Sequence, residues 1–252
     1  MTGFARTLSC FRNQRLASLE WLGSEIDMTR LRHIGFLLFD DLTQLDFTGP
    51  LQVLNRIPGA TVHLVARQQG PVRTDCGPFI LADTDFANCP QLDLICVPGG
   101  WGIDQAMEDD ATLDFLRRQA AGAQYVTSVC TGAFILGAAG LLDGVKATTH
   151  WRYHSALPRF GAIPVQARVV RDGSVFTGGG VTAGIDFALT IVREVFGEGL
   201  AQAIQLGLEY DPHPPVDCGS PTKASPAILD AVDSQFAPRW DAFLRVVDRL
   251  TG

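Results

Sequence analysis

Residues 124–142 read QYVTSVCTGAFILGAAGLL, and this stretch decides the fold class. The first part, Gln124–Val129, has the apolar pattern of a short buried strand, and small residues after Cys130 begin a helical pattern over Thr131–Leu142. A cysteine at such a junction projects from the carboxyl edge of a sheet, as at a nucleophile elbow. The free N–H groups at the start of the helix favour its thiolate. We therefore predict that Cys130 is a nucleophile; the alternative is a buried structural cysteine.

The chain before this elbow alternates between strands and helices. Strand patterns fall at Arg32–Phe39, Thr61–Ala66 and Leu92–Val97, with helical patterns at Thr48–Ile57 and Asp104–Ala120. The strands are nearly continuous apolar runs, which is typical of parallel strands buried on both faces. We expect a single α/β domain, with a mostly parallel sheet covered by helices on both faces in a flavodoxin-like arrangement.

Further patterns complete the chain. They predict a hairpin or edge excursion at Arg73–Ala82, two strands within Val165–Thr177 that turn at Asp172 and Gly173, helices at Val181–Phe196, Ile228–Gln235 and Arg239–Leu250, and an extended proline-rich segment at Asp211–Pro226.

Residues 1–29 are expected to form an extension outside the fold. The α/β domain then occupies residues 30–252. The segment Met1–Asp27 contains arginines but no continuous apolar run before a small-residue cleavage site, so it does not resemble a secretory signal. Met28 is a candidate start of the protein, and an ordered N-terminal arm is the alternative.

Composition favours a small neutral or apolar ligand. The net charge is −7 and no long basic run is present, which argues against nucleic acid as a partner. No run reaches the roughly 18 apolar residues of a membrane span, so no membrane partner is expected. Six scattered cysteines without a C-x-x-C pair suit a reducing, cytoplasmic setting. Only His150 and His154 have ligand-like spacing, and we interpret them as a helix-start and a surface residue, with no metal site.

Two further segments complement the elbow. Glycines in Val97–Gly102 (VPGGWG) let main-chain N–H groups approach a ligand and stabilise negative charge, although tight-turn glycines are the alternative. Asp46 stands at the carboxyl end of the first strand region, just before a helix, at the edge where parallel strands converge. It is expected beside Cys130, where it exchanges a proton and has a raised pKa; an ordinary helix cap is the alternative.

These three segments, in this order, resemble the ThiJ/PfpI superfamily of class I glutamine-amidotransferase-like proteins over about Arg30 to Leu250. The stretches SVCTGAFILGAAGLLDG (128–144), ATTHW (147–151) and VTAGIDFAL (181–189) are similar to one branch of it. That branch contains isonitrile hydratases and the sensor domains of AraC-type regulators.

The resemblance implies roles for particular residues. Cys130 becomes the nucleophile, Asp46 its acidic partner, and the N–H groups of Gly100 and Thr131 surround the reacting atom. Many superfamily members have His after the cysteine and Glu at the acidic position, so peptidase, glyoxalase-like or deglycase activity is not expected here. The Thr131 hydroxyl contacts substrate or water but is no base near neutral pH. A homodimer is also implied.

Isonitrile hydration is the activity that the resemblance favours. Cys130 would attack the terminal carbon to form a thioimidate, and water positioned by Asp46 and Thr131 would convert it to an N-substituted formamide without cofactor or metal. Trp101 and Trp151 follow segments that should face the cleft, which predicts apolar substrates.

The alternative is a non-catalytic sensor domain of the AraC-regulator type, lacking its DNA-binding part. Such a regulator needs roughly a hundred further residues of helix-turn-helix, whereas Leu208–Pro221 looks like a hydratase tail. Gly179, within Thr177–Gly180, is expected to border the active site. Its segment is either loose enough to let the next helix shift or a strained turn that needs a positive φ.

Overall fold

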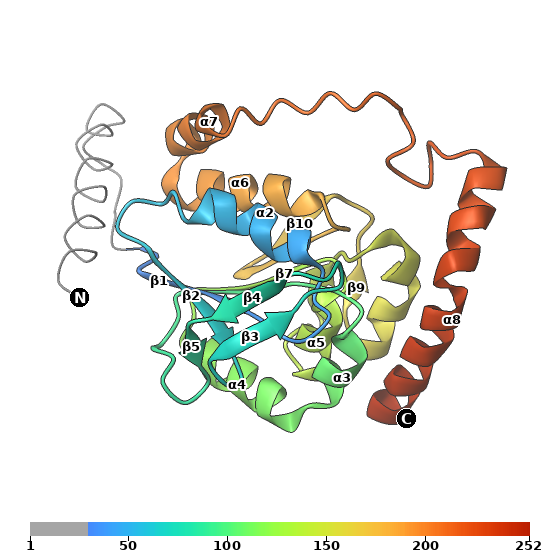
Figure 1. Cartoon of the computed structure of the whole chain (residues 1–252), viewed down its shortest axis with the longest axis horizontal. Helices are drawn as coiled ribbons and strands as arrows, with labels where there is room; N and C mark the ends of the chain where they lie inside the picture. Colours follow the sequence, from blue (N-terminus) through green and yellow to red (C-terminus); the bar gives the residue numbers. More distant parts are fainter. Residues whose placement is uncertain (1–29) are drawn as a thin grey trace.

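A seven-stranded sheet forms the centre of the molecule in the computed structural model, which describes residues 30–252 (Figure 1). The strand order is β10-β11-β7-β6-β1-β2-β5, and only the edge strand β10 is antiparallel to its neighbour. The strands are β1 (His33–Leu37), β2 (Thr61–Ala66), β5 (Thr84–Asp85), β6 (Leu94–Val97), β7 (Tyr125–Val129), β10 (Val169–Asp172) and β11 (Val175–Gly178). The predicted α/β class and mostly parallel sheet are confirmed. The extension predicted for residues 1–29 lies outside the described residues.

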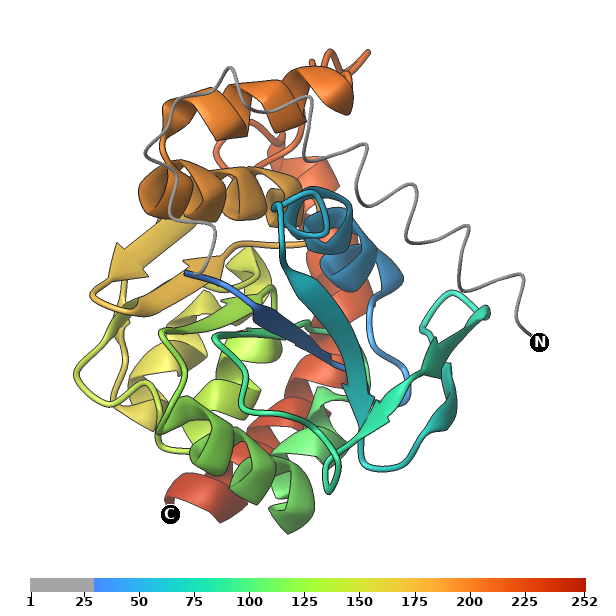
Figure 2. The same ribbon diagram turned by 90° about the vertical axis from the view of Figure 1, so that its left-hand side faces the viewer.

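Helices cover both faces of this sheet (Figures 1 and 2). One face carries α2 (Gln44–Leu54), α6 (Ala183–Phe196) and α7 (Glu198–Gly207). The other carries α3 (Ile103–Glu108), α4 (Asp110–Ala120), α5 (Gly132–Ala138), the 3₁₀ helix η2 (Trp151–Phe160) and the long α8 (Pro226–Thr251). Each side has its own apolar core, centred on Phe36, Phe47 and Phe187 beneath α2 and α6, and on Phe115, Phe134 and Phe243 on the opposite side.

The predicted hairpin is present beside the main sheet, and the two strands predicted within Val165–Thr177 belong to the main sheet itself. Strands β3 (Gly70–Arg73) and β4 (Phe79–Ala82) form a separate antiparallel hairpin, and β10 and β11 turn at Gly173, which has a φ of 58°. A short parallel pair, β8 (Lys146–Ala147) with β9 (Ile163–Pro164), flanks η2.

The helix predicted from Thr48 begins four residues earlier, at Gln44. Its N-cap is Thr43, whose N–H donates to the Gly99 carbonyl at 2.8 Å and whose hydroxyl donates to Asp75 at 2.8 Å. These contacts fix the chain in a helical start that propensity alone does not indicate. Asp46 consequently lies inside the first turn of α2 and not ahead of the helix.

Two other helix boundaries differ from the prediction. The single helix expected over Asp104–Ala120 is two, because Asp109 is extended and its carboxylate accepts the Thr112 N–H to cap α4. The two helices expected after Pro226 are one, α8, which continues through Pro238. Aromatic side chains of α8 pack on Tyr153 along its length, and this packing outweighs the single N–H that proline lacks. Helix α7 was not predicted, and of η2 only a helix start at the His150 and His154 pair was expected. No helix within residues 30–252 is long and apolar enough to cross a bilayer.

Candidate active site

Cys130 stands at a strained turn between β7 and α5. Its φ is 56°, in the left-handed region that residues with a Cβ rarely occupy. Three hydrogen bonds hold the turn: the Cys130 N–H donates to the carbonyls of Gly178 (3.0 Å) and Gly179 (3.1 Å), and its carbonyl accepts from the Thr149 hydroxyl at 2.7 Å. The side chain is only 5% exposed. The predicted nucleophile elbow is therefore present.

Asp46 is fully buried beside this cysteine. One carboxylate oxygen, Oδ2, accepts the Gly99 N–H at 3.0 Å, whereas Oδ1 makes no hydrogen bond of normal geometry within the described residues. Burial raises the pKa of Asp46 to about 7, opposed by the Gly99 N–H and the Cys130 thiol and assisted by the charge of Asp75. The raised pKa agrees with the prediction and lets this carboxyl exchange a proton near neutral pH.

The surroundings of Cys130 favour the thiol over the thiolate. Burial, and then the charge of Asp46, raise the pKa of Cys130 well above its ordinary value, while the N–H groups of Thr131 and Val181 lower it. The N–H groups at the start of the helix thus lower the pKa of Cys130 as expected, but burial and the charge of Asp46 raise it by more. The thiol is therefore the favoured form of Cys130 in this structure.

The main-chain N–H groups of the glycine segment are already engaged by the protein. Gly99 donates to Asp46, and Gly100 donates to the Thr131 hydroxyl oxygen at 3.1 Å. In this structure the Gly100 N–H is directed at Thr131, so its contact with the reacting atom stays a prediction. The Thr131 N–H, by contrast, influences the sulfur as expected.

A cavity of about 150 Å³ opens above Cys130, and four predicted residues line it: Cys130, Thr131, Gly100 and Trp101. Asp46 does not line it. Asp46 Oδ2 and Thr131 Oγ1 both lie beside Gly99, where an added Cβ would come within 2.9 Å and 2.5 Å of them. Thr131 faces the cavity, and Asp46 lies outside its lining.

Six further residues line the cavity and were not predicted as site residues: Thr43, Asp75, His150, Tyr153, Val181 and Phe236. Phe236 comes from α8, about a hundred residues after the elbow, and no local motif marks it. His150 is the N-cap of η2, as the helix-start interpretation implied, but it also faces the cavity. Its position directly after the ATTHW threonines was the one available signal.

Gly179 and Trp151 lie outside the lining of the cavity. The Gly179 carbonyl accepts the Cys130 N–H, and Trp151 packs on His150 with ring centroids 5.6 Å apart, but neither lines the cavity. None of Gly178, Gly179 and Gly180 has a positive φ, so the strained-turn interpretation of this segment is wrong. Its looseness stays a prediction.

The other described cysteines lack the surroundings of Cys130. Cys96 is fully buried in β6, and burial raises its pKa to about 12, in agreement with its interpretation as a core residue. Cys76, Cys89 and Cys218 are unpaired and outside the cavity. No cluster of metal-ligating side chains occurs within residues 30–252.

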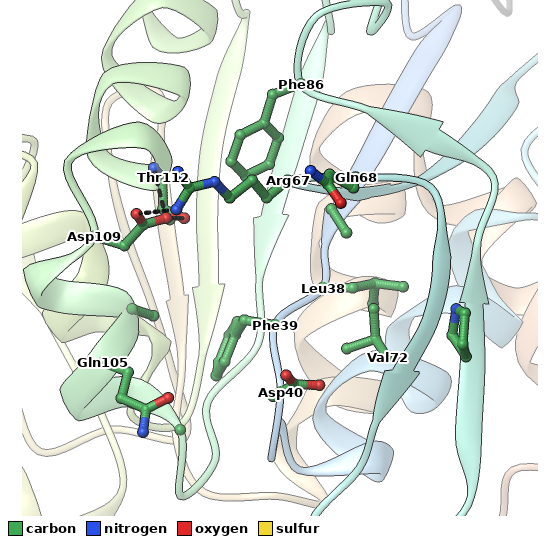
Figure 3. A pocket seen from close by; sticks show the side chains of 14 residues that line it. Leu38, Phe39, Asp40, Arg67, Gln68, Val72, Phe86, Gln105, Asp109 and Thr112 are labelled. Atoms are coloured by element: carbon green, nitrogen blue, oxygen red, sulfur yellow. Dashed lines mark hydrogen bonds and ion pairs between the residues drawn. The ribbon is translucent and has the colours of Figure 1, made fainter.

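A larger cavity of about 410 Å³ lies elsewhere, between the β3 hairpin and the start of α4 (Figure 3). Arg67 reaches across it to Asp109 at 2.9 Å, and Asp109 also accepts the Thr112 hydroxyl at 2.6 Å. No cysteine or histidine is among the residues that line it. The cysteine at the elbow therefore belongs to the smaller cavity.

Comparison with known proteins places this geometry in context. Residues 32–194 match the model of the DJ-1/PfpI family. The chain is 55% identical over 216 residues to an isonitrile hydratase from Pseudomonas putida, spanning 86% of this chain and 95% of that protein. A crystal structure of a ThiJ/PfpI family protein from Pseudomonas syringae superposes with a TM-score of 0.85 at 40% identity, covering 91% of this chain and 94% of that one.

Regulators are more distant relatives. The HTH-type transcriptional regulator GbdR of Pseudomonas aeruginosa is 31% identical over 186 residues, which are 71% of this chain but only 50% of the regulator. The similarity thus extends over half of that protein, whereas nearly the whole length of the hydratase is matched.

Proposed function

Because this chain belongs to the DJ-1/PfpI family, we propose that it is an isonitrile hydratase, which adds water to R–N≡C and releases an N-substituted formamide. The observation that carries the proposal is the Cys130 thiol beside the Asp46 carboxyl beneath a small cavity, in a chain 55% identical to a hydratase of that name. The reaction needs only water as co-substrate, and we propose no metal or cofactor.

In the first step, Cys130 adds to the substrate. Asp46 takes the thiol proton as the sulfur–carbon bond forms at the terminal carbon, and it then gives this proton to the same carbon. The product is a thioimidate, R–N=CH–S, attached to Cys130. Atom balance assigns this first proton to carbon; the nitrogen gains its proton only when water adds. Asp46, with a pKa raised to about 7 by burial, suits this exchange at neutral pH.

In the second step, water converts the thioimidate to product. A water molecule held at the Thr131 hydroxyl attacks the carbon, the C=N electron pair moves to nitrogen, and the proton that water loses passes to nitrogen. The carbon–sulfur bond then breaks, and the hydroxyl proton returns to sulfur through Asp46. We assign Asp46 to sulfur and not to the water because it does not line the cavity.

The cavity indicates which isonitriles fit. Trp101, Tyr153 and Phe236 bring aromatic rings to its walls, and its volume of about 150 Å³ suits a small apolar substituent. Trp101 and Phe236 are themselves in contact, with ring centroids 5.6 Å apart. We therefore propose small alkyl or aryl isonitriles as substrates.

An assay with a simple alkyl isonitrile tests this function. We expect purified protein to release the matching formamide, followed by liquid chromatography and mass spectrometry, and Cys130→Ala to abolish turnover while the fold is retained. Cys76→Ala, which removes an exposed thiol outside the cavity, is the matched control and should remain active. A silent wild-type protein with an intact Cys130 thiol would instead favour the sensor function of the regulator relatives.

We further propose a cytoplasmic homodimer. The dimer is supported by an unusually apolar hairpin face, on which Phe79 and Leu81 of β4 are 64% and 67% exposed. A cytoplasmic setting is supported by cysteines that are unpaired throughout the described part of the chain.

A further inference from the structure

Two hydrogen-bond donors of η2 face the cavity above Cys130. His150 is the N-cap of this helix and Tyr153 follows three residues later. A 3₁₀ helix has three residues per turn, so side chains at i and i+3 lie in one row. Both residues line the cavity, and their rings are 6.0 Å apart. One short helix therefore presents an imidazole and a phenol to the same small space.

The imidazole of His150 is a neutral donor. Its Nδ1 accepts the Arg152 N–H at 3.3 Å, which places the ring proton on Nε2. Burial, and then the charge of Arg152, lower the pKa of His150 to about 4, so the ring is uncharged at neutral pH. Within residues 30–252, Nε2 has no hydrogen-bond partner. Its N–H is therefore available to a ligand.

The position of the imidazole is fixed by its neighbours. Gly180 lies against the ring edge, where a Cβ would come within 2.5 Å of His150 Cδ2. Phe236 packs on the ring from α8, with centroids 5.4 Å apart. The donor is thus held in place before any ligand arrives, which is the condition under which a hydrogen bond contributes most to catalysis.

Tyr153 supplies the second donor. It is only 3% exposed, yet its hydroxyl has no hydrogen-bond partner in the described part of the chain. Burial, and then the charges of Asp104 and Cys130, raise the pKa of Tyr153 to about 12, so the hydroxyl keeps its proton. Phe243 and Trp240 hold the ring, at centroid distances of 5.1 and 5.6 Å.

We propose that His150 Nε2–H and Tyr153 O–H form a donor pair that receives the substrate nitrogen while water adds to the thioimidate. The inference rests on the proposed function and assigns two further catalytic residues to it. As the water oxygen bonds to carbon, the C=N electron pair moves to nitrogen, and two fixed donors stabilise the charge that develops there. Both residues keep their own protons, because the proton that nitrogen gains comes from water.

The pair acts on the second step and not on the first. When sulfur adds to the isonitrile, the electron pair ends on carbon and is taken up by the proton from Asp46, so little charge develops on nitrogen. Removing a donor should therefore slow the decay of the thioimidate and leave its formation nearly unchanged. The covalent intermediate should then accumulate on Cys130.

Two variants test the pair. Tyr153→Phe removes only the hydroxyl, and His150→Asn removes the imidazole while keeping an N-cap acceptor for η2. Tyr125→Phe is the matched control, because Tyr125 lies outside the cavity and packs on Phe176. We expect kcat to fall by roughly 100-fold in each cavity variant, the lower range for loss of one donor to a developing charge, and to stay unchanged in the control.

Rapid quenching and intact mass spectrometry supply the decisive measurement. The cavity variants should carry the substrate mass on Cys130 during turnover at a higher fraction than the wild type. An increase in KM with unchanged kcat, or a fall in kcat without accumulated adduct, would overturn the proposal. Failure of the proposed function is distinguishable, since the wild type itself would then form no formamide.

Discussion

At the scale of single residues, the site depends on two buried acids that influence each other. Asp46 and Cys130 each have a pKa raised first by burial, and each is moderated by main-chain N–H groups. Only one of them needs to be charged at a time, so the proposed proton exchange would not place two charges in an apolar interior. The elbow sequence indicates the cysteine directly, and the strand-end argument indicates the aspartate.

Asp46→Asn should lower kcat by a factor of about 100 or more, the usual range for loss of a group that transfers a proton, with a smaller effect on KM. The amide keeps the size of the carboxyl but cannot take the thiol proton. Steady-state kinetics with an alkyl isonitrile measure the effect. An unchanged kcat would reduce Asp46 to a structural role in the first turn of α2.

The same variant has a predicted effect on stability. The folded-state pKa of Asp46, about 7, lies above the ordinary value of 3.8, so the folded state binds the proton more tightly than the unfolded chain. This tighter proton binding stabilises the folded state by an amount on the order of a few kcal/mol. The stabilisation is fully present below about pH 4 and is lost as pH rises through 7. Asp46→Asn should therefore gain stability relative to wild type between about pH 4 and 7 in urea titrations, and this gain should stay constant at higher pH. A difference that does not change between about pH 4 and 7 would contradict the raised pKa.

The residues that sequence reasoning missed are those that long-range packing brings to the site. Tyr153 and Phe236 look like ordinary core aromatics, because only the docking of α8 on η2 brings them to one cavity. The hydrogen bond from the Gly100 N–H to Thr131 was equally unpredictable from local sequence, since it joins residues 31 positions apart. Local motifs thus indicated Cys130 and Asp46, but they did not indicate the residues from distant elements that surround them.

At the scale of elements, the close contact of α5 with the β6 loop depends on Gly132. A Cβ there would lie 2.2 Å from the Val97 carbonyl oxygen, whereas a Cβ on Gly179 would meet nothing closer than 3.5 Å. We expect Gly132→Ala to destabilise the protein by about 1–3 kcal/mol through overpacking and Gly179→Ala to change stability by less than about 0.5 kcal/mol. Chemical denaturation compares the two, and equal losses would contradict this assignment.

The apolar pattern of the sequence predicted which segments form strands and which form helices. It did not predict where these elements begin and end. Strands β1 (HIGFL) and β6 (LICV) were predictable because strands buried on both faces are largely apolar. Strands β2 (TVHLVA) and β7 (YVTSV) include polar residues but keep enough apolar ones to indicate a strand. The start of α2 was not, because Thr43 is held by the distant Asp75 and Gly99. Pro238 likewise suggested a break that tertiary packing on α8 overrides.

At the scale of the whole molecule, the exposed apolar face of β4 predicts self-association. Light scattering at micromolar concentration should give the mass of two chains, each of 27.2 kDa. Leu81→Asp should shift this mass toward one chain, because it places a charge in the expected interface. Leu206→Asp, on the exposed surface of α7, is the control and should leave the dimer intact. A wild-type monomer would refute the dimer.

The position of α8 in the chain has a consequence for biosynthesis. The aromatic wall that Phe236 contributes is translated about a hundred residues after the elbow that holds Cys130. During synthesis, β7 and α5 leave the ribosome first, so the reactive thiol is made before the helix that encloses it. Until α8 docks, a nascent chain presents an open sulfur to any oxidant or electrophile in its surroundings. The time between the synthesis of Cys130 and the docking of α8 therefore sets how long the sulfur of each new molecule is open to such reagents.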